Sequence, residues 1–209
     1  MNKIIISAYS GDLYKKMSDI TYQLVQNYAK KYNADYKLIK LKNIDRPASW
    51  QKIPIIKKYL KKYDIVLWID VDVVIIYDEE DIFENIEPNI IQYMVNHQIR
   101  DFTVPNSGVW MVTKKILPYL DIIWENHQYI NHGLWEQAAL IELMGYEVDY
   151  FRSDLRYRTN LFHKTKWLHP KWNHHPEDLN QVEYPNFIHV TMYEDRLNKI
   201  KEIIKEFIL

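Results

Sequence analysis

Cysteine is absent from this sequence of 209 residues, and long apolar runs are missing too. Without cysteine the chain cannot form disulfides, thiolate nucleophiles, zinc fingers or iron–sulfur clusters. The first apolar run, Ile4–Ile6, is too short for a signal peptide, and no uncharged apolar stretch reaches the roughly 18 residues of a membrane span. We therefore expect a cytoplasmic protein with no membrane span.

The chain also has no surplus of positive charge. Its 27 Lys and Arg residues stand against 28 Asp and Glu, so the formal net charge is −1. Neutralising nucleic-acid phosphates needs a basic surplus, so nucleic acid is not an expected partner. Hydrophobic residues make up 47% of the chain, which rules out wholesale disorder. The length predicts one domain over residues 1–209, either complete or cut from a longer protein of viral or bacterial origin, since high Asn, Ile, Lys and Tyr usage is typical of AT-rich genomes.

Strand and helix patterns alternate along the chain. Apolar runs predict strands at Ile4–Ile6, Tyr36–Leu41 and Ile65–Ile69, separated by helices at Leu13–Tyr28 and Ile53–Leu60. This β-α-β-α-β opening predicts an α/β fold with a mostly parallel central sheet flanked by helices. Further strands are expected at Ile90–Val95, Val109–Val112, Glu147–Phe151 and Phe187–Val190, further helices at Lys114–His127, Leu134–Met144 and Leu197–Phe207, and irregular structure over residues 152–186.

Two carboxylates interrupt the most apolar segment of the chain. Asp70 and Asp72 follow the run Ile65–Ile69 directly, with apolar residues on both sides. In an extended chain residues two apart face the same way, so both carboxylates can face one cation at the carboxyl end of a strand. Carboxylate oxygens suit Mg²⁺ or Mn²⁺, which bridge to substrate phosphates. The plainer alternative is a pair of exposed aspartates in a turn.

Two known enzyme classes carry this local pattern. In phosphatases that resemble haloacid dehalogenases, a hydrophobic strand ends in Asp-x-Asp; Asp70 would then be the phosphorylated nucleophile and Asp72 the general acid. Metal-dependent glycosyltransferases of the GT-A fold also carry an Asp-x-Asp signature. Two βα units precede Asp70, and no later paired-acid strand end is evident, which favours the second class.

The surroundings of the pair resemble one GT-A family, that of the fungal α-galactosyl- and α-mannosyltransferases and the plant xyloglucan xylosyltransferases. The order and rough spacing of the matching pieces agree over most of the chain. The resemblance implies a single GT-A-like, Rossmann-like domain. The matching pieces are Trp50-Gln51-Lys52, Tyr63 to Asp72, Asn106-Ser107-Gly108, Glu136 to Leu140 and Phe187-Ile188-His189-Val190.

The resemblance also implies roles for individual residues. Asp70, Asp72 and His189 would hold Mn²⁺, or Mg²⁺, on the donor diphosphate, and Gln137 and Glu136 would be the catalytic residues beside the donor sugar. The expected partners are a UDP- or GDP-sugar donor and a glycan acceptor. The donor-binding residues are expected to be Ser7, Ala8, Tyr9, Tyr36, Lys52, Asp70, Val71, Asn106, Ser107 and Gly108.

The sequence departs from this family after His189. A glycine and a diphosphate-binding lysine follow the family's histidine, whereas Met192 and Glu194 stand in that region here. The charge of the leaving group would then be met by the metal, by Lys52 or by one of three further cations, Arg196, Lys164 and Lys166. The sequence favours a metal-dependent glycosyltransferase, and the resemblance alone implies retention. The alternatives are a phosphatase that uses Asp70, and a nucleotide-sugar binding module without turnover.

A second region bears on the acceptor. Residues 157–176 combine basic and aromatic side chains, among them Trp167 and Trp172. Sugars present apolar faces that stack on tryptophan, so this region is a candidate acceptor site. A structured loop that covers the sheet explains the same composition equally well.

Overall fold

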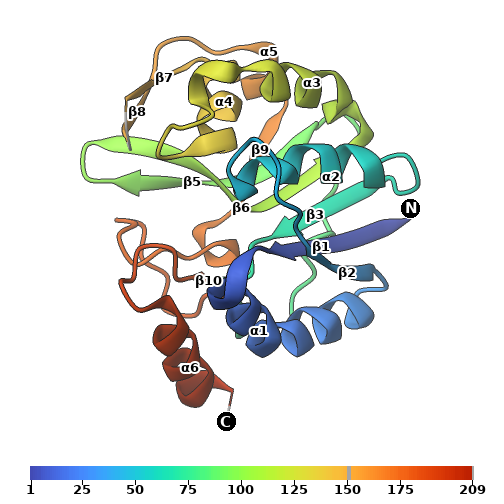
Figure 1. The fold of residues 1–209 in the computed structure, drawn as a ribbon, viewed down its shortest axis with the longest axis vertical. Coiled ribbons are helices and arrows are strands. Elements are labelled where there is room, and N and C mark those ends of the chain that lie inside the picture. Colours follow the sequence, from blue (N-terminus) through green and yellow to red (C-terminus); the bar gives the residue numbers. More distant parts are fainter. Residues whose placement is uncertain (150–151, 209) are drawn as a thin grey trace.

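The computed structural model describes residues 1–149 and 152–208, which form an α/β fold around a six-stranded sheet (Figure 1). The strand order is β2-β1-β3-β6-β5-β9. Its strands are β1 (Lys3–Tyr9), β2 (Asp35–Lys40), β3 (Ile65–Ile69), β5 (Gln92–Ile99), β6 (Phe102–Thr113) and β9 (Thr165–Trp167). Two small sheets pair β4 (Val73–Ile75) with β10 (Phe187–His189), and β7 (Tyr146–Asp149) with β8 (Arg152–Leu155).

Helices cover both faces of the central sheet (Figure 1). The helices α2 (Lys52–Tyr59), α3 (Leu117–Glu125) and α4 (Trp135–Leu143) pack on one face, in a core that contains Trp50 and Trp110. The helices α1 (Gly11–Lys31) and α6 (Arg196–Phe207) lie on the other face, α6 beside the β4–β10 pair. A short helix, α5 (Asn160–His163), precedes β9. The predicted class, an α/β fold with a sheet flanked by helices, is confirmed.

The parallel strand directions predicted from the sequence are confirmed in the first half of the sheet. β1 pairs in parallel with both β2 and β3, and β5 pairs in parallel with β9. β6 runs antiparallel between β3 and β5, so the sheet is mixed at its centre. Because β1, β3 and β5 all run the same way, their carboxyl ends lie at one edge of the sheet, where open α/β sheets bind ligands.

Several local predictions need correction. Residues 152–186 are not irregular throughout, since β8, α5, β9 and the 3₁₀ turn η4 (Pro170–Trp172) lie there. The helix expected over Lys114–His127 is divided into the 3₁₀ turn η2 (Lys114–Ile116), then α3, then the turn η3 (His127–Tyr129). The strand expected over Glu147–Phe151 appears as β7, and residues 150 and 151 lie outside the described residues.

The inward face of α1 buries Met17, Thr21, Val25 and Tyr28, whereas Leu13 is 52% exposed. None of the helices in the described part of the chain combines the length and apolar character needed to cross a membrane.

Candidate metal and donor site

The carboxylate pair lies in a turn between β3 and β4. The N–H of Val73 donates to the carbonyl of Asp70 at 3.0 Å, which closes the turn over Asp70 and Asp72. The extended chain predicted here from the sequence is wrong. The turn still brings the two carboxylates together, and it leaves Asp72 only 4% exposed.

His189 completes the cluster from the C-terminal part of the chain. β10 pairs antiparallel with β4 so that His189 stands opposite Val73, and the N–H of Val190 donates to the carbonyl of Asp72 at 3.0 Å. One ligand atom each from Asp70, Asp72 and His189 lies within 4.8 Å of the others. Two carboxylates and an imidazole form a donor set that suits Mn²⁺ or Mg²⁺ better than soft metals.

Arg196 also faces Asp72. Its Nη1 lies 3.0 Å from Asp72 Oδ2 and 3.3 Å from the hydroxyl oxygen of Tyr14, while His189 Nε2 lies 3.4 Å from Asp72 Oδ1. Burial raises the pKa of Asp72, but His189 and Arg196 outweigh burial and lower that pKa to about 2. Asp72 therefore stays ionised over the whole physiological pH range, as a metal ligand must.

A buried lysine links Asp70 to α4. Lys52 Nζ lies 3.5 Å from Asp70 Oδ1 and 3.0 Å from Glu136 Oε1, and it donates to the carbonyl of Ser107 at 3.0 Å. Burial lowers the pKa of Lys52, but the two carboxylates raise it more. Burial raises the pKa of Glu136, and Asp70 raises it further against the opposing effect of Lys52. The single ammonium group of Lys52 thus balances the charge of two carboxylates. Glu136 Oε2 has no hydrogen-bond partner among the described residues.

Gln137 is held against β6 rather than free in solvent. The N–H and the hydroxyl of Ser107 both donate to Gln137 Oε1, at 3.0 and 3.2 Å. Asn106, Ser107 and Gly108 lie inside β6, which begins before the strand predicted at Val109–Val112. Val95 pairs with Asn106 and Met94 with Trp110, so residues 107–109 form a bulge on the side of β5. Bulges are common beside functional sites because they redirect side chains.

Gly108 makes room for the histidine of the cluster. A Cβ atom at Gly108 would lie 2.3 Å from Cε1 and 2.7 Å from Nδ1 of His189, and 2.9 Å from Oδ1 of Asn106. Carbon atoms cannot approach this closely, so any side chain at this position must displace His189. The glycine is therefore required for close packing rather than for an unusual φ angle.

Replacing Gly108 with alanine is expected to weaken divalent-metal binding at least about tenfold, the lower scale for disturbing the surroundings of a metal site. The added methyl group would push His189 away from Asp72. Calorimetric titration with Mn²⁺ measures the effect. The comparison is His189→Ala: if the methyl group acts by displacing His189, adding Gly108→Ala to His189→Ala should weaken metal binding little further. If Gly108→Ala alone retains the metal affinity of the parent, His189 is not a ligand.

Most of the other predicted donor-binding residues lie at the carboxyl edge of the sheet, and one lies within β2 away from that edge. Tyr9 ends β1 at the carboxyl edge, Ser7 is buried there, and Val71 is buried within the Asp70–Asp72 turn. Tyr36 stands apart, because it pairs with Ile5 and lies four positions before the end of β2. Ala8 is half-buried beside Ser7 and Tyr9. The site roles of these residues remain predictions.

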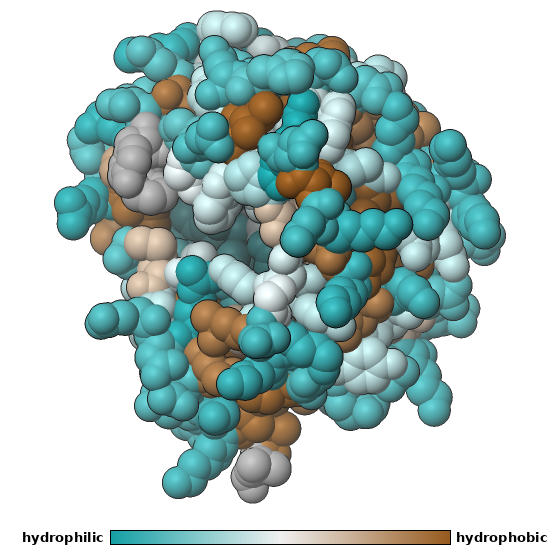
Figure 2. All heavy atoms as spheres, in the orientation of Figure 1, coloured by the Kyte–Doolittle hydropathy of each residue, from teal (hydrophilic) through white to brown (hydrophobic). Residues whose placement is uncertain are grey.

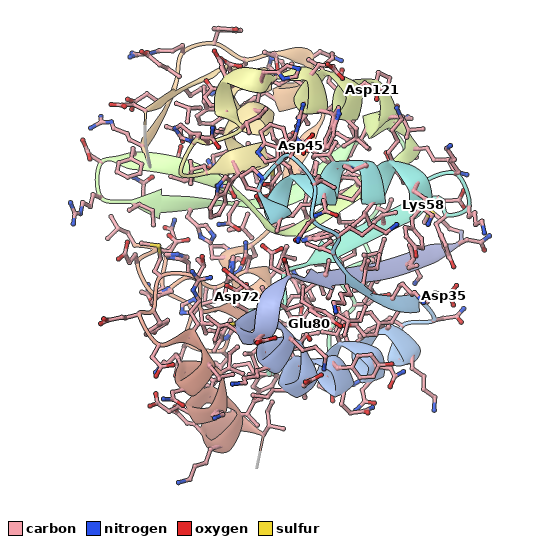
Figure 3. All side chains as sticks on the ribbon, in the orientation of Figure 1. Asp35, Asp45, Lys58, Asp72, Glu80 and Asp121 are labelled. Carbon is pink, nitrogen blue, oxygen red and sulfur yellow. The ribbon has the colours of Figure 1, made fainter. Side chains whose placement is uncertain are left out.

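Two of the three alternative diphosphate cations lie away from the carboxylates. Lys166 pairs with Glu87 beside the edge strand β9, and Lys164 precedes that strand. Only Arg196, of these three, contacts the cluster. Figure 2 shows a hollow near the centre of the face on view, between the regions that Figure 1 labels β6 and β10, and Figure 3 shows Asp72 near the middle of the molecule beside the start of α1.

Some residues of the site were missed. Trp68 Nε1 donates to Asp70 Oδ1 at 2.6 Å, and the spacing of two residues on a strand could have indicated this contact. Asn173 is fully buried and donates to Asn106 Oδ1 at 2.9 Å, a pairing for which the sequence carries no signal.

A buried hydrogen bond between a histidine and a carboxylate holds in place the segment that precedes β10. His97 Nδ1 lies 2.7 Å from Asp178 Oδ2, and both residues are almost fully buried. Burial lowers the pKa of His97, which favours a neutral ring that donates its Nδ1–H to Asp178. His174, in the same segment, accepts the N–H of His189 on its carbonyl at 2.9 Å. The segment thereby positions the histidine of the metal cluster.

Comparison with known proteins identifies the fold and nothing narrower. The sequence matches no protein-family model and no curated protein. A glycosyltransferase involved in glycosylation of the major capsid of PBCV-1 superposes with a TM-score of 0.75 at 17% identity, over 97% of this chain and 100% of that one. The galactosyltransferase LgtC, in complex with donor and acceptor sugar analogs, gives 0.65 at 10% identity, over 99% and 96%. The glycosyltransferase GlyE of Streptococcus pneumoniae gives 0.60 at 12% identity, over 99% and 64%. At these identities the likeness shows that the chain has the GT-A fold of these glycosyltransferases.

Proposed function

We propose that this protein is a metal-dependent glycosyltransferase that moves a sugar from a UDP- or GDP-sugar to a glycan or another hydroxyl acceptor. The observation that carries the proposal is the convergence of Asp70, Asp72 and His189, with ligand atoms within 4.8 Å, on a glycosyltransferase fold. The cluster lies at the carboxyl ends of the parallel strands, where this class of sheet receives ligands.

The metal site and its cations would hold the donor diphosphate. Bound Mn²⁺ or Mg²⁺ would neutralise the phosphates and assist their departure as a Lewis acid. Arg196 replaces the missing family lysine in this proposal, because its guanidinium already lies at the cluster, 3.0 Å from Asp72. A guanidinium also matches phosphate oxygens in a bidentate arrangement, which supports this assignment.

Lys52, Glu136 and Gln137 would face the donor sugar. The unpartnered Oε2 atom of Glu136 supports this assignment, since a buried carboxylate oxygen needs a donor and a sugar hydroxyl can supply one. Gln137 would lie beside the anomeric carbon as charge develops there. Transfer with retention, and the narrower likeness to the fungal and plant family, rest on the sequence resemblance.

The pKa of Asp72 argues against the phosphatase alternative. A general acid must carry a proton at the working pH. His189 and Arg196 lower the pKa of Asp72, which favours the ionised carboxylate over the protonated form that a general acid needs. Asp70, the required nucleophile, is bound on Oδ1 by Trp68 and faces Lys52. Both features suit a metal ligand better than a free attacking group.

The proposal predicts that a nucleotide-sugar stabilises the fold only when a divalent cation is present. A ligand that binds the native state but not the unfolded chain raises the unfolding temperature, and the stabilisation grows with the logarithm of the ligand concentration relative to its Kd. A thermal-shift screen of UDP- and GDP-sugars with Mn²⁺, and again with a chelator, measures this effect. A nucleotide-sugar that stabilises the protein is then tested for slow hydrolysis and for transfer to glycans.

Two outcomes would separate the alternatives. Stabilisation without hydrolysis or transfer to any acceptor in the screen would favour the binding module. Equal stabilisation by the same nucleotide-sugar in Mn²⁺ and in chelator would contradict the assignment of Asp70, Asp72 and His189 as the metal site.

A further inference from the structure

Trp135 holds a backbone conformation that bulky residues avoid. Its φ angle is +47°, and the other non-glycine residues with positive φ among those described are Asn33 and Arg100. Asparagine tolerates this region, and Arg100 lies in the tight connection between β5 and β6. Trp135 instead begins α4, directly before Glu136 and Gln137. Strain of this kind is retained where the surroundings impose it, and it clusters at functional sites.

Hydrogen bonds on both sides fix the conformation of Trp135. Its N–H donates to the carbonyl of His132 at 3.0 Å, and the N–H of Gln137 donates to the carbonyl of Leu134 at 3.0 Å. The resulting bend sends Glu136 and Gln137 into the interior, where they are 3% and 8% exposed. Glycine would make this bend without strain. The chain nevertheless carries tryptophan, the residue with the largest side chain, at this position, which indicates that the indole itself has a function.

The indole of Trp135 lies on the surface, and the residue directly precedes Glu136 and Gln137 in the chain. Trp135 is 43% exposed, whereas Trp50 and Trp110 are fully buried. No hydrogen bond joins its indole N–H to the part of the chain that the structure describes. An exposed indole offers a flat apolar face together with a free N–H donor, a combination that suits a ligand with one apolar face and surrounding hydroxyl groups.

We propose that Trp135 is a stacking platform for a sugar ring of the acceptor. This inference rests on the proposed function, because it places the acceptor relative to the donor. Glu136 and Gln137 would face the donor sugar from inside, so the residue just before them on the solvent side meets whatever approaches from solution. In a transferase that second ligand is the acceptor. A pyranose ring has an apolar face of C–H groups that packs on an indole, and its hydroxyls can accept the indole N–H.

The site differs from the one that composition suggested. The aromatic and basic segment 157–176 was the candidate acceptor region, but Trp172 in that segment is 7% exposed and packs edge-on against Phe187, and Trp167 packs against Phe162. Those two indoles belong to the hydrophobic packing of the sheet. Trp135 is the more exposed indole.

The test observes the indole N–H signals directly by NMR. The sequence has seven tryptophans, and the variant Trp135→Phe identifies the signal of Trp135 by its absence. The parent protein, with UDP or GDP and diamagnetic Mg²⁺, is titrated with the methyl glycosides of glucose, galactose, mannose and xylose. We expect at least one glycoside to shift the Trp135 signal saturably, while the signals of Trp50 and Trp110 stay in place. If every glycoside leaves the Trp135 signal unmoved, or shifts the signals of Trp50 and Trp110 as much, the proposal is overturned.

Stability measurements test the strain separately. Trp135→Gly should unfold at a higher temperature than Trp135→Ala, although glycine is normally the weaker helix former. The reverse order would show that the backbone at this position is unstrained and would remove the argument from conformation.

Kinetics connect the platform to transfer. In a working transfer assay, Trp135→Ala should raise the acceptor KM about tenfold, from loss of aromatic stacking and apolar contact, with a smaller change in kcat. Trp135→Phe should recover part of the loss because it keeps a ring. If a nucleotide-sugar binds in a metal-dependent way but no glycoside shifts the Trp135 signal, this inference alone is overturned. If no nucleotide-sugar binds in a metal-dependent way, the proposed function is overturned.

Discussion

Asparagine in place of Asp72 is expected to abolish metal-dependent binding of UDP or GDP, with a loss of affinity of at least about 100-fold. The side chains have the same shape, but asparagine cannot offer an anionic oxygen to the cation. The carboxylate also faces Arg196 at 3.0 Å and His189 at 3.4 Å, so its loss leaves an excess of positive charge exactly where a cation must bind. Calorimetric titration of the nucleotide in Mn²⁺ measures the change.

The matched control is Asp121→Asn. Asp121 lies in α3, is exposed and pairs with Lys57 at the periphery, whereas Asp72 lies near the middle of the molecule (Figure 3). Asp121→Asn should bind nucleotide as the parent does. Circular dichroism must show that Asp72→Asn is folded at the temperature of the titration. A folded Asp72→Asn protein with the parent's metal-dependent affinity would remove Asp72 from the metal site.

The sequence predicted which residues come together at this site better than it predicted the backbone conformation that brings them together. Two carboxylates inside an apolar segment implied a common target, and that inference did not depend on whether the chain was a strand or a turn. Strand periodicity correctly predicted that Asp70 and Asp72 lie close together. The two carboxylates converge through a turn closed by Val73, however, and not along a strand. Short apolar segments leave such details open because a turn of four residues has almost no pattern of its own.

Contacts between distant parts of the chain were harder to predict. The resemblance brought His189 to the carboxylates, whereas its packing against Gly108 depends on the pairing of β10 with β4 and on the bulge in β6. Neither the bulge nor the buried pair Asn173–Asn106 leaves a mark in a single sequence. The edge strand β9 was missed for a related reason: it has three residues, and its pairing with β5 is tertiary.

Lys52 has a structural environment that the sequence did not reveal. An ordinary solvated helix lysine was as good an explanation of the sequence as a donor-binding lysine. The structure places Lys52 at 3% exposure between Asp70 and Glu136, where its charge balances two carboxylates of the fold itself. Only the tertiary arrangement of α2 against α4 and the Asp70 turn reveals this.

Replacing Lys52 with methionine is therefore expected to destabilise the protein by about 3–5 kcal/mol, the usual cost of leaving one member of a buried ion pair without its partner. Methionine fills a similar volume, so the loss comes mainly from the uncompensated carboxylate of Glu136. Unfolding in urea, followed by fluorescence, measures the free energy. Lys58→Met is the control on the same helix, because Lys58 is exposed and lies at the surface (Figure 3), and it should change stability little.

A second substitution tests whether the charge of Glu136 causes the loss. The double variant Lys52→Met with Glu136→Gln should be more stable than Lys52→Met alone, since glutamine carries no charge into the interior. Coupling between residues in direct contact is expected to reach about 0.5–3 kcal/mol. If the two changes simply add, or if Lys52→Met costs no more than Lys58→Met, the cluster of Lys52, Asp70 and Glu136 does not have the energetic role that its burial implies.

The pH dependence of Lys52→Met supplies an independent check on the same carboxylate. In the parent, burial raises the pKa of Glu136 and Lys52 opposes that rise. Without Lys52 the pKa must rise further, so the folded state of the variant binds a proton more tightly than the unfolded chain does. Such a group contributes its stability fully below the unfolded pKa and loses it as the pH rises through the folded pKa. The deficit of Lys52→Met relative to the parent should therefore shrink as the pH falls through the raised pKa of Glu136 in the folded variant. A deficit that stays constant or grows on acidification would mean that Glu136 is not the group left without its counter-ion.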